Sequence, residues 1–168
     1  MYLYTIGRQL KEREMKLSNN FSLAEFTKSQ TALRLDIDNT PGQEHLDAAI
    51  ALFDKVVQPV RDQFGPTTIN SGYRGPELNK AVGGSSKSQH CNGEAVDIEC
   101  PGVANYDIAK WIEDNLEVDQ LILEFYTPGI PDSGWVHVSY KADGSNRKQS
   151  LTAMKENGKT VYKTGLIE

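Results

Sequence analysis

Two histidines and one aspartate are the residues of this chain whose types and spacing could do chemistry together. His90 and Asp97 lie in the segment 88–98, and His137 lies in the segment 134–139. The chain has three histidines, and two of them fall in these short segments. Three protein ligands of this kind leave the fourth position of a tetrahedral Zn²⁺ open for water, which a catalytic zinc site requires. The sequence therefore predicts a catalytic zinc site.

The strand period decides whether these side chains can converge. In a strand over residues 95–100, Asp97 lies opposite the apolar face, and in a strand over residues 135–140 the same holds for His137. If the two strands are neighbours, both side chains point into one cleft, which His90 can reach from its loop. Taken alone, His137 could be an ordinary half-buried histidine and Asp97 a rim carboxylate. Their combination with His90 and its glycine-bounded loop favours the metal site.

A hydrolytic site also needs a base and a group that holds the substrate. Arg74 follows an expected strand end, where its guanidinium could bind a substrate carboxylate or simply pair with Glu77. Glu124 is a lone carboxylate in an apolar strand, so it is a candidate base, although it could instead pair with a Lys or Arg. Asp132, which lies shortly before His137, is the rival base.

The other residues of chemical interest have plainer interpretations. We expect Cys91 and Cys100 to be small buried thiols and not metal ligands, because two cysteines are too few for a disulfide framework. His45 lies far from the motifs in sequence, and we expect it at the surface. The glycine-rich segment 83–86 lacks the Gly-Lys-Ser/Thr ending of a phosphate loop, so nucleotide binding is not expected.

The patterns along the chain predict one α+β domain, with a small antiparallel sheet flanked by helices. Ser22 and Glu25 have the spacing of a capping box. A long helix is expected from Thr40-Pro41 to Gly65-Pro66, with a kink at Pro59. A further helix is expected over 105–115, and strands are expected over 67–70, 95–100, 119–126, 135–140, 151–155 and 159–162, the last two joined by a tight turn at Asn157-Gly158. Residues 1–15 are expected to be a flexible N-terminal extension, and residues 16–168 the folded domain.

Composition narrows the possible partners. The net charge of −5 and the absence of a block of like charges argue against nucleic acid. No apolar run approaches the roughly 20 residues of a membrane span, and the sequence shows no charged-then-apolar stretch before a small-residue cleavage site. We therefore expect a soluble monomer that is made in the cytoplasm without a signal peptide and does not insert into membranes.

The combined motifs closely resemble the family of zinc D-Ala-D-Ala carboxypeptidases and L-alanyl-D-glutamate peptidases. The resemblance covers roughly residues 17–166. It rests on Ser71-Gly72-Tyr73-Arg74, Leu78-Asn79, Val82-Gly83-Gly84, Ser88-Gln89-His90, Gly93-Glu94-Ala95, Asp97 and Trp135-Val136-His137. It implies a hedgehog-like α+β fold for the zinc peptidase domain at 16–168. The segment Phe21–Phe26 is similar to the phage-encoded branch.

The resemblance implies that His90, Asp97 and His137 bind Zn²⁺ and that Arg74 holds a substrate carboxylate. It further implies a substrate site with contributions from Ser71, Tyr73, Ser88 and Trp135. Some relatives carry their base three residues before the last histidine, but that position here is Gly134. The base therefore lies between Glu124 and Asp132, and Glu124 is favoured because an apolar strand raises the pKa of a carboxyl group.

The expected substrate is the stem peptide of bacterial peptidoglycan. The expected role is phage lysis or wall penetration, after release from the host or as a virion component. Two other classes stay open. A non-haem Fe(II) oxygenase also uses two histidines and a carboxylate, and a non-catalytic zinc module could bind the cell wall or a virion partner.

Overall fold

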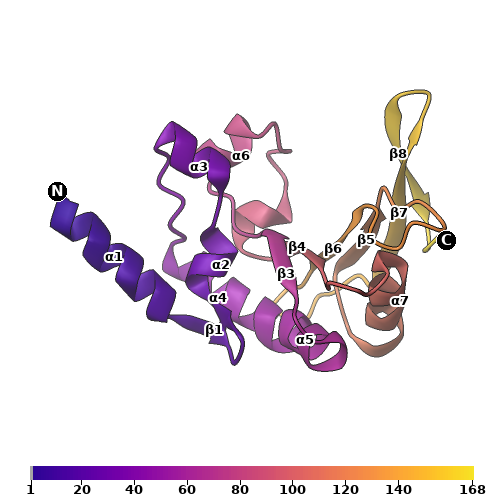
Figure 1. Ribbon diagram of the computed structural model, residues 1–168, viewed down its shortest axis with the longest axis horizontal. Helices are drawn as coiled ribbons and strands as arrows, with labels where there is room; N and C mark the ends of the chain where they lie inside the picture. The colour runs from indigo at the N-terminus through magenta and orange to yellow at the C-terminus, as the bar shows by residue number, and fades with distance from the viewer. Residues whose placement is uncertain (1) are drawn as a thin grey trace.

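The computed structural model describes residues 2–168, in which helices fill the first half of the chain and strands the second (Figure 1). The helical elements are α1 (Tyr2–Glu14), α2 (Leu23–Thr27), α3 (Gln30–Leu35), α4 (Gln43–Leu52), η1 (Phe53–Val57), α5 (Gln58–Phe64), α6 (Pro76–Ala81), η2 (Gln89–Asn92) and α7 (Asn105–Asn115). The strands are β1 (Lys16–Ser18), β2 (Phe21–Ser22), β3 (Thr68–Ser71), β4 (Ala95–Glu99), β5 (Gln120–Glu124), β6 (Trp135–Ser139), β7 (Gln149–Glu156) and β8 (Lys159–Thr164). The expected α+β class is confirmed.

One mixed sheet organises the second half of the chain. Its strand order is β3-β4-β6-β5-β7-β8, and a separate two-stranded sheet joins β1 and β2. Every neighbouring pair in the large sheet is antiparallel except β5 and β7, which are parallel. The expectation of an antiparallel sheet is therefore wrong for one pair. Strand β6 ends beside the start of β5, and the connection over residues 140–148 keeps the chain at this end of the sheet until β7 begins on the other side of β5. Strand β7 therefore runs in the same direction as β5.

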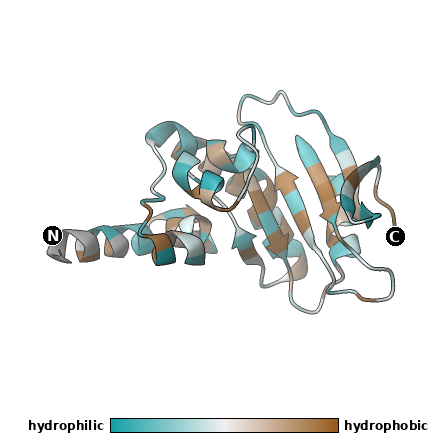
Figure 2. Ribbon diagram, turned by 90° about the horizontal axis from the view of Figure 1, so that it is seen from above, coloured by the Kyte–Doolittle hydropathy of each residue, from teal (hydrophilic) through white to brown (hydrophobic). Residues whose placement is uncertain are grey.

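Hydrophobic and hydrophilic residues alternate along strands of the large sheet (Figure 2). Because successive side chains of a strand point to opposite faces, the sheet has one apolar and one polar face. The apolar face carries six fully buried side chains from the three central strands, where each burial contributes about 1.5–3 kcal/mol. They are Val96, Ile98, Leu121, Leu123, Val136 and Val138. Helix α7 packs against β5 and β6, and buries Ile108 and Ile112 in the same core. The opposite face is left for polar side chains, among them Asp97 and His137.

The predicted long helix is interrupted where Pro59 enters it. Helix α4 ends at Leu52, η1 is a π-helical turn, and α5 then runs to Phe64. Proline lacks the N–H of an α-helical bond and clashes with the preceding turn, so the wider π turn accommodates it. The helical spacing of the sequence predicts one apolar face with Leu46, Ile50, Phe53, Val57, Val60 and Phe64. Phe53, Val57 and Val60 are fully buried as this pattern predicts, whereas Ile50 is 39% exposed.

Two local signals produce the structures expected from them. Ser22 accepts a hydrogen bond from the Glu25 N–H while the Glu25 carboxylate accepts one from the Ser22 N–H, which completes the capping box of α2. Asn157 and Gly158 both have positive φ and form the tight turn between β7 and β8. The long helix, in contrast, begins at Gln43 and not at Pro41, since Thr40 donates its N–H to Asp38 before the helix starts.

The N-terminal segment is helical in the structure. Residues 2–14 form α1, which extends away from the sheet, so the two ends of the described chain lie far apart (Figure 1). Its Arg8 guanidinium donates hydrogen bonds to the Asp38 carboxylate at 3.2 and 3.3 Å. The expected boundary at residue 16 and the flexibility of the segment before it stay predictions. Within the described residues, none of the helices is both long and apolar enough to span a membrane.

Candidate metal centre

His90 is presented by the short 3-10 turn η2. The Ser88 hydroxyl accepts a hydrogen bond from the His90 N–H and caps this turn. The turn ends at Gly93, which has a φ of +72°, and a Cβ there would lie 2.2 Å from the His45 carbonyl oxygen, so only glycine fits. The His90 Nδ1 donates to the Gly72 carbonyl oxygen at 2.7 Å, because a carbonyl can only accept. This contact fixes the ring and leaves Nε2 as the ligand atom.

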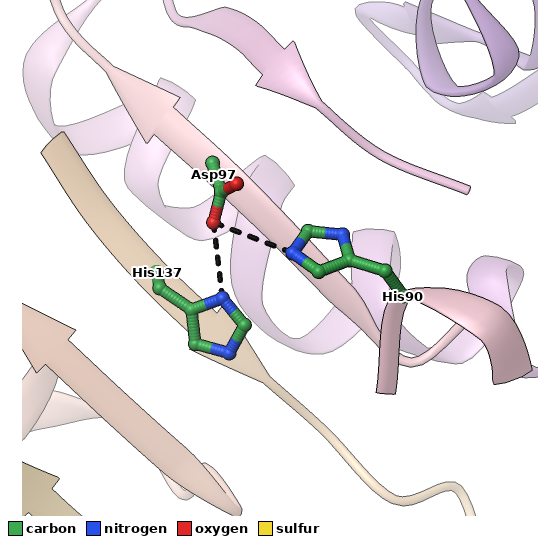
Figure 3. Close-up of side chains that lie close together, drawn as sticks. All are labelled: His90, Asp97 and His137. Atoms are coloured by element: carbon green, nitrogen blue, oxygen red, sulfur yellow. Dashed lines mark hydrogen bonds and ion pairs between the residues drawn. The ribbon is translucent and has the colours of Figure 1, made fainter. Parts of the chain in front are cut away.

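Asp97 and His137 are brought together by strand register. They are directly opposite each other on β4 and β6, so their side chains share one face of the sheet. Figure 3 shows both imidazoles turned toward the Asp97 carboxylate from different elements. The Asp97 Oδ1 lies 3.0 Å from His137 Nδ1 and 3.4 Å from His90 Nε2. Three residues that are distant in sequence therefore meet at one point.

The geometry and the chemistry of this group fit a zinc ion. One ligand atom from each residue lies within 4.8 Å of the other two. In a tetrahedral zinc site with metal–ligand distances near 2.05 Å, ligand atoms are about 3.3 Å apart, close to the separations from Asp97 Oδ1. Burial alone would raise the pKa of Asp97, but hydrogen bonds from His137 and His90 outweigh it and hold this pKa well below its usual range. The carboxylate is thus ionised and ready to bind a cation.

Glu124 lies on the same face of the sheet as Asp97 and His137, one row of side chains farther along the strands. Ile122 pairs with His137, and Glu124 pairs with Trp135, so the carboxylate of Glu124 occupies the row next to the metal group. Burial, together with the nearby negative charge of Asp97, raises the pKa of Glu124 above its usual value, although the neighbouring cationic groups oppose the shift. A carboxyl group of raised pKa beside a metal group suits proton transfer.

Gly134 explains why the base does not lie three residues before His137. Gly134 has a φ of +66°, and a Cβ there would lie 2.0 Å from the Glu124 carbonyl oxygen. The backbone that carries Glu124 thus occupies the space that a side chain at position 134 would need. The rival base, Asp132, is exposed and lines a different hollow with Pro131 and Thr68. Of the two candidates, the structure brings only Glu124 to the metal group.

A cleft of about 740 Å³ contains the metal group and Glu124. Arg74, Ser88 and Trp135 also line it, as expected for residues that contact a substrate. The backbone N–H of Arg74 donates a hydrogen bond to the backbone carbonyl oxygen of His90 at 3.1 Å, which links the segment after β3 to η2. Within the described residues no carboxylate forms an ion pair with Arg74, Glu77 included, and its Nε is buried without a hydrogen-bond partner. Its guanidinium is therefore available to an anionic ligand.

The structure places two of the expected substrate-binding residues outside the cleft. Tyr73 is buried against Phe26, and its hydroxyl contacts His45 Nδ1 at 3.1 Å. Ser71 lines a separate hollow together with Tyr73. A direct substrate contact is thus not supported for either residue. His45 is correspondingly half-buried against the Ser71–Arg74 segment, and the expectation of a surface histidine is wrong.

The two cysteines lie outside the metal group. Cys100 is buried, as expected, whereas Cys91 is only partly buried. Burial raises the pKa of both thiols, which keeps them protonated and unsuited to metal binding.

Sequence reasoning missed several residues that line the cleft, among them Lys141, Arg147 and Tyr162. Tyr162 reaches it through register alone, because β7 pairs with both β5 and β8 and places Ala153 between Glu124 and Tyr162. Arg147 and Lys141 lie in the connection between β6 and β7. None of the three belongs to a short motif, so no local signal marked them.

An α+β domain with an open three-ligand metal group and an adjacent half-buried carboxylate defines the class of metal-dependent hydrolases. The sequence profile of the family described as Peptidase M15 matches residues 19–139, which is most of the chain. The chain therefore belongs to the peptidase M15 family, whose members are zinc-dependent peptidases that act on peptidoglycan. A comparison with curated proteins found no match.

Proposed function

We propose that this protein hydrolyses a peptide bond in the stem peptide of bacterial peptidoglycan, as a carboxypeptidase or an L-alanyl-D-glutamate endopeptidase. One observation carries the proposal. The ligand atoms of His90, Asp97 and His137 converge in a cleft that Glu124 and Arg74 also line. The family match favours this reaction over oxygenation or passive wall binding.

The zinc ion would be held by His90 Nε2, a carboxylate oxygen of Asp97 and His137 Nδ1. When bound, zinc polarises the scissile carbonyl and lowers the pKa of water toward about 7. The Gly72 carbonyl keeps the His90 ring oriented through Nδ1. The register of β4 and β6 keeps Asp97 and His137 aligned, so the ligands are arranged before the ion arrives.

Glu124 is the proposed general base and acid. Its carboxylate takes a proton from the attacking water and delivers it to the nitrogen of the leaving amine. Arg74 binds a substrate carboxylate through its forked guanidinium and so positions the scissile bond. Ser88 and Trp135 wall the cleft beside these groups.

The biological setting we propose is lysis or wall penetration by a phage, with the protein acting on the wall as a monomer. The similarity of the Phe21–Phe26 segment to the phage-encoded branch supports this setting.

The test is digestion of purified peptidoglycan by the zinc-loaded protein, followed by mass spectrometry of the released fragments. Wild-type protein should release fragments whose new termini identify the cleaved bond, and a chelator should stop the release. Glu124→Gln should retain zinc but lose about 10²–10⁴-fold in rate, whereas the matched variant Asp132→Asn should keep the wild-type rate. Binding to the wall without any fragment would refute the peptidase and favour a non-catalytic wall-binding module.

A further inference from the structure

Four cationic side chains line the cleft: Arg74, Lys87, Lys141 and Arg147. Arg74 follows β3, Lys141 follows β6 and Arg147 precedes β7. Since β3/β4, β4/β6 and β5/β6 are antiparallel and β5/β7 parallel, these three chain positions lie at the same edge of the sheet, where the strands β3 and β6 end and β7 begins. Lys87 lies in the loop before η2. Glu124 is at the opposite end of β5.

Arg147 is held rigidly at this edge by a buried carboxylate. Its Nε donates to Asp119 Oδ1 at 3.0 Å and its Nη2 donates to Asp119 Oδ2 at 2.8 Å. Asp119 is fully buried and also accepts from the Gln89 side chain at 3.0 Å. Burial would raise the pKa of Asp119, but these hydrogen bonds outweigh it and lower the pKa to about 2. The carboxylate thus stays ionised and fixes the plane of the guanidinium.

The clamped guanidinium keeps binding capacity for a ligand. Arginine has five N–H donors, and Asp119 occupies one edge of the fork. No group of the described residues accepts from Nη1 of Arg147, whose side chain is 51% exposed and lines the cleft. The geometry is that of a preorganised donor with one edge buried and the other open.

Lys141 adds a positive charge to the cleft. Its side chain is half-buried in the cleft wall and forms no ion pair within the part of the chain that the structure describes. Four cations and three carboxylates (Glu94, Asp97 and Glu124) line the cleft, and the Asp119 carboxylate that binds Arg147 brings the charges into balance before any metal binds. The whole chain carries −5. A cleft without the net negative charge of the rest of the protein suits an anionic substrate.

We propose that Arg147 and Lys141 form a second carboxylate subsite, separate from the one at Arg74, so that the preferred substrate is a peptide with two carboxylates. This inference rests on the proposed function and deepens it. Both residues lie outside residues 19–139, the segment shared with the peptidase M15 family. The subsite would select among stem peptides.

Three peptides test the subsite: L-Ala-γ-D-Glu-L-Lys-D-Ala with both carboxylates free, its α-carboxamide at D-Glu, and its C-terminal amide. Their dissociation constants are measured on zinc-loaded Glu124→Gln protein, and kcat/KM is measured on the wild type. With two subsites, each single amidation should weaken binding by about tenfold or more. If Arg74 alone binds a substrate carboxylate, only one of the two amidations should raise the dissociation constant, and this result would overturn the proposal.

Variants in the same background assign the second subsite. Lys141→Gln should abolish the effect of one amidation and keep the other, and Arg147→Lys, which keeps a charge for Asp119, should reduce the same effect. Lys148→Gln is the matched control, because Lys148 pairs with Glu117 and does not line the cleft; it should keep both effects. Persistence of both effects in Lys141→Gln and Arg147→Lys would overturn the assignment. Peptides that bind with this pattern but are never cleaved would refute the proposed function alone.

Discussion

Replacing Asp119 by Asn tests the buried ion pair that supports one end of the cleft. The substitution removes the negative charge but keeps the shape of the side chain and one oxygen acceptor for Arg147. Hydrogen bonds to the carboxylate lower its pKa from the usual 3.8 to about 2. A pKa shift of roughly two units, at about 1.4 kcal/mol for each unit, contributes about 2.5 kcal/mol to the free energy of unfolding. This contribution is complete when Asp119 is ionised in both the folded and the unfolded state. Because the Arg147 side chain is half exposed, water screens part of its interaction with Asp119. We therefore expect Asp119→Asn to lower the free energy of unfolding by about 1–2 kcal/mol.

The sign of the pH dependence follows from the lowered pKa. A carboxyl group whose pKa is depressed by folding contributes stability above its unfolded pKa, near 4, and loses it as the pH falls toward 2. Urea unfolding of zinc-free wild type and Asp119→Asn should therefore differ most at pH 6, and the two free energies of unfolding should approach each other between pH 4 and pH 2. Glu117→Gln, which removes an exposed carboxylate paired with Lys148, should stay close to the wild type. Equal stabilities at pH 6, or a difference that persists unchanged to pH 2.5, would refute the reasoning.

Three further substitutions test the metal group, the substrate contact and the strained glycine. His137→Ala removes one of three ligands and should raise the zinc dissociation constant by more than about a hundredfold, measured by competition with a chelator; unchanged zinc affinity would exclude His137 as a ligand. Arg74→Lys keeps the charge but loses the fork, so kcat/KM for a carboxylate-bearing peptide should fall about 10–100-fold with normal zinc content; an unaltered kcat/KM would mean that Arg74 does not hold the substrate. Gly134→Ala combines a φ of +66° with a Cβ 2.0 Å from the Glu124 carbonyl oxygen, whereas Gly158→Ala has a φ of +77° and open space. In thermal unfolding, Gly134→Ala should lower the free energy of unfolding by more than about 2 kcal/mol, and Gly158→Ala by only about 1 kcal/mol. Equal losses in the two variants would show that the backbone at Glu124 can shift freely.

Signals that act over a few residues made much of the fold predictable. The capping box at Ser22, the turn at Asn157-Gly158 and the helix over 105–115 depend on neighbours in sequence, and each forms where expected. Strand alternation likewise separated Asp97 and His137 from the apolar face. These patterns succeed because their physical cause is local.

Contacts between distant segments could not be predicted in the same way. The choice between Glu124 and Asp132 depended on the pairing of β5 with β6, which no periodicity reveals. The burial of Tyr73 depended on α4, which brings His45 against its hydroxyl. The π turn before Pro59 interrupted a helix that periodicity alone predicts as continuous. In each case tertiary packing, and not local preference, decided the outcome.

The imidazoles of His90 and His137 both approach Oδ1 of Asp97, and this contact affects how a zinc ion would bind. Ionised Asp97 can only accept hydrogen bonds, so in this contact the proton lies on His137 Nδ1, the same atom that would ligate zinc. Zinc binding through Nδ1 therefore requires the neutral His137 ring to move this proton to Nε2, so the ring changes tautomer as the ion binds. The hydrogen bond between His137 and Asp97 holds both side chains in the arrangement that the ion requires.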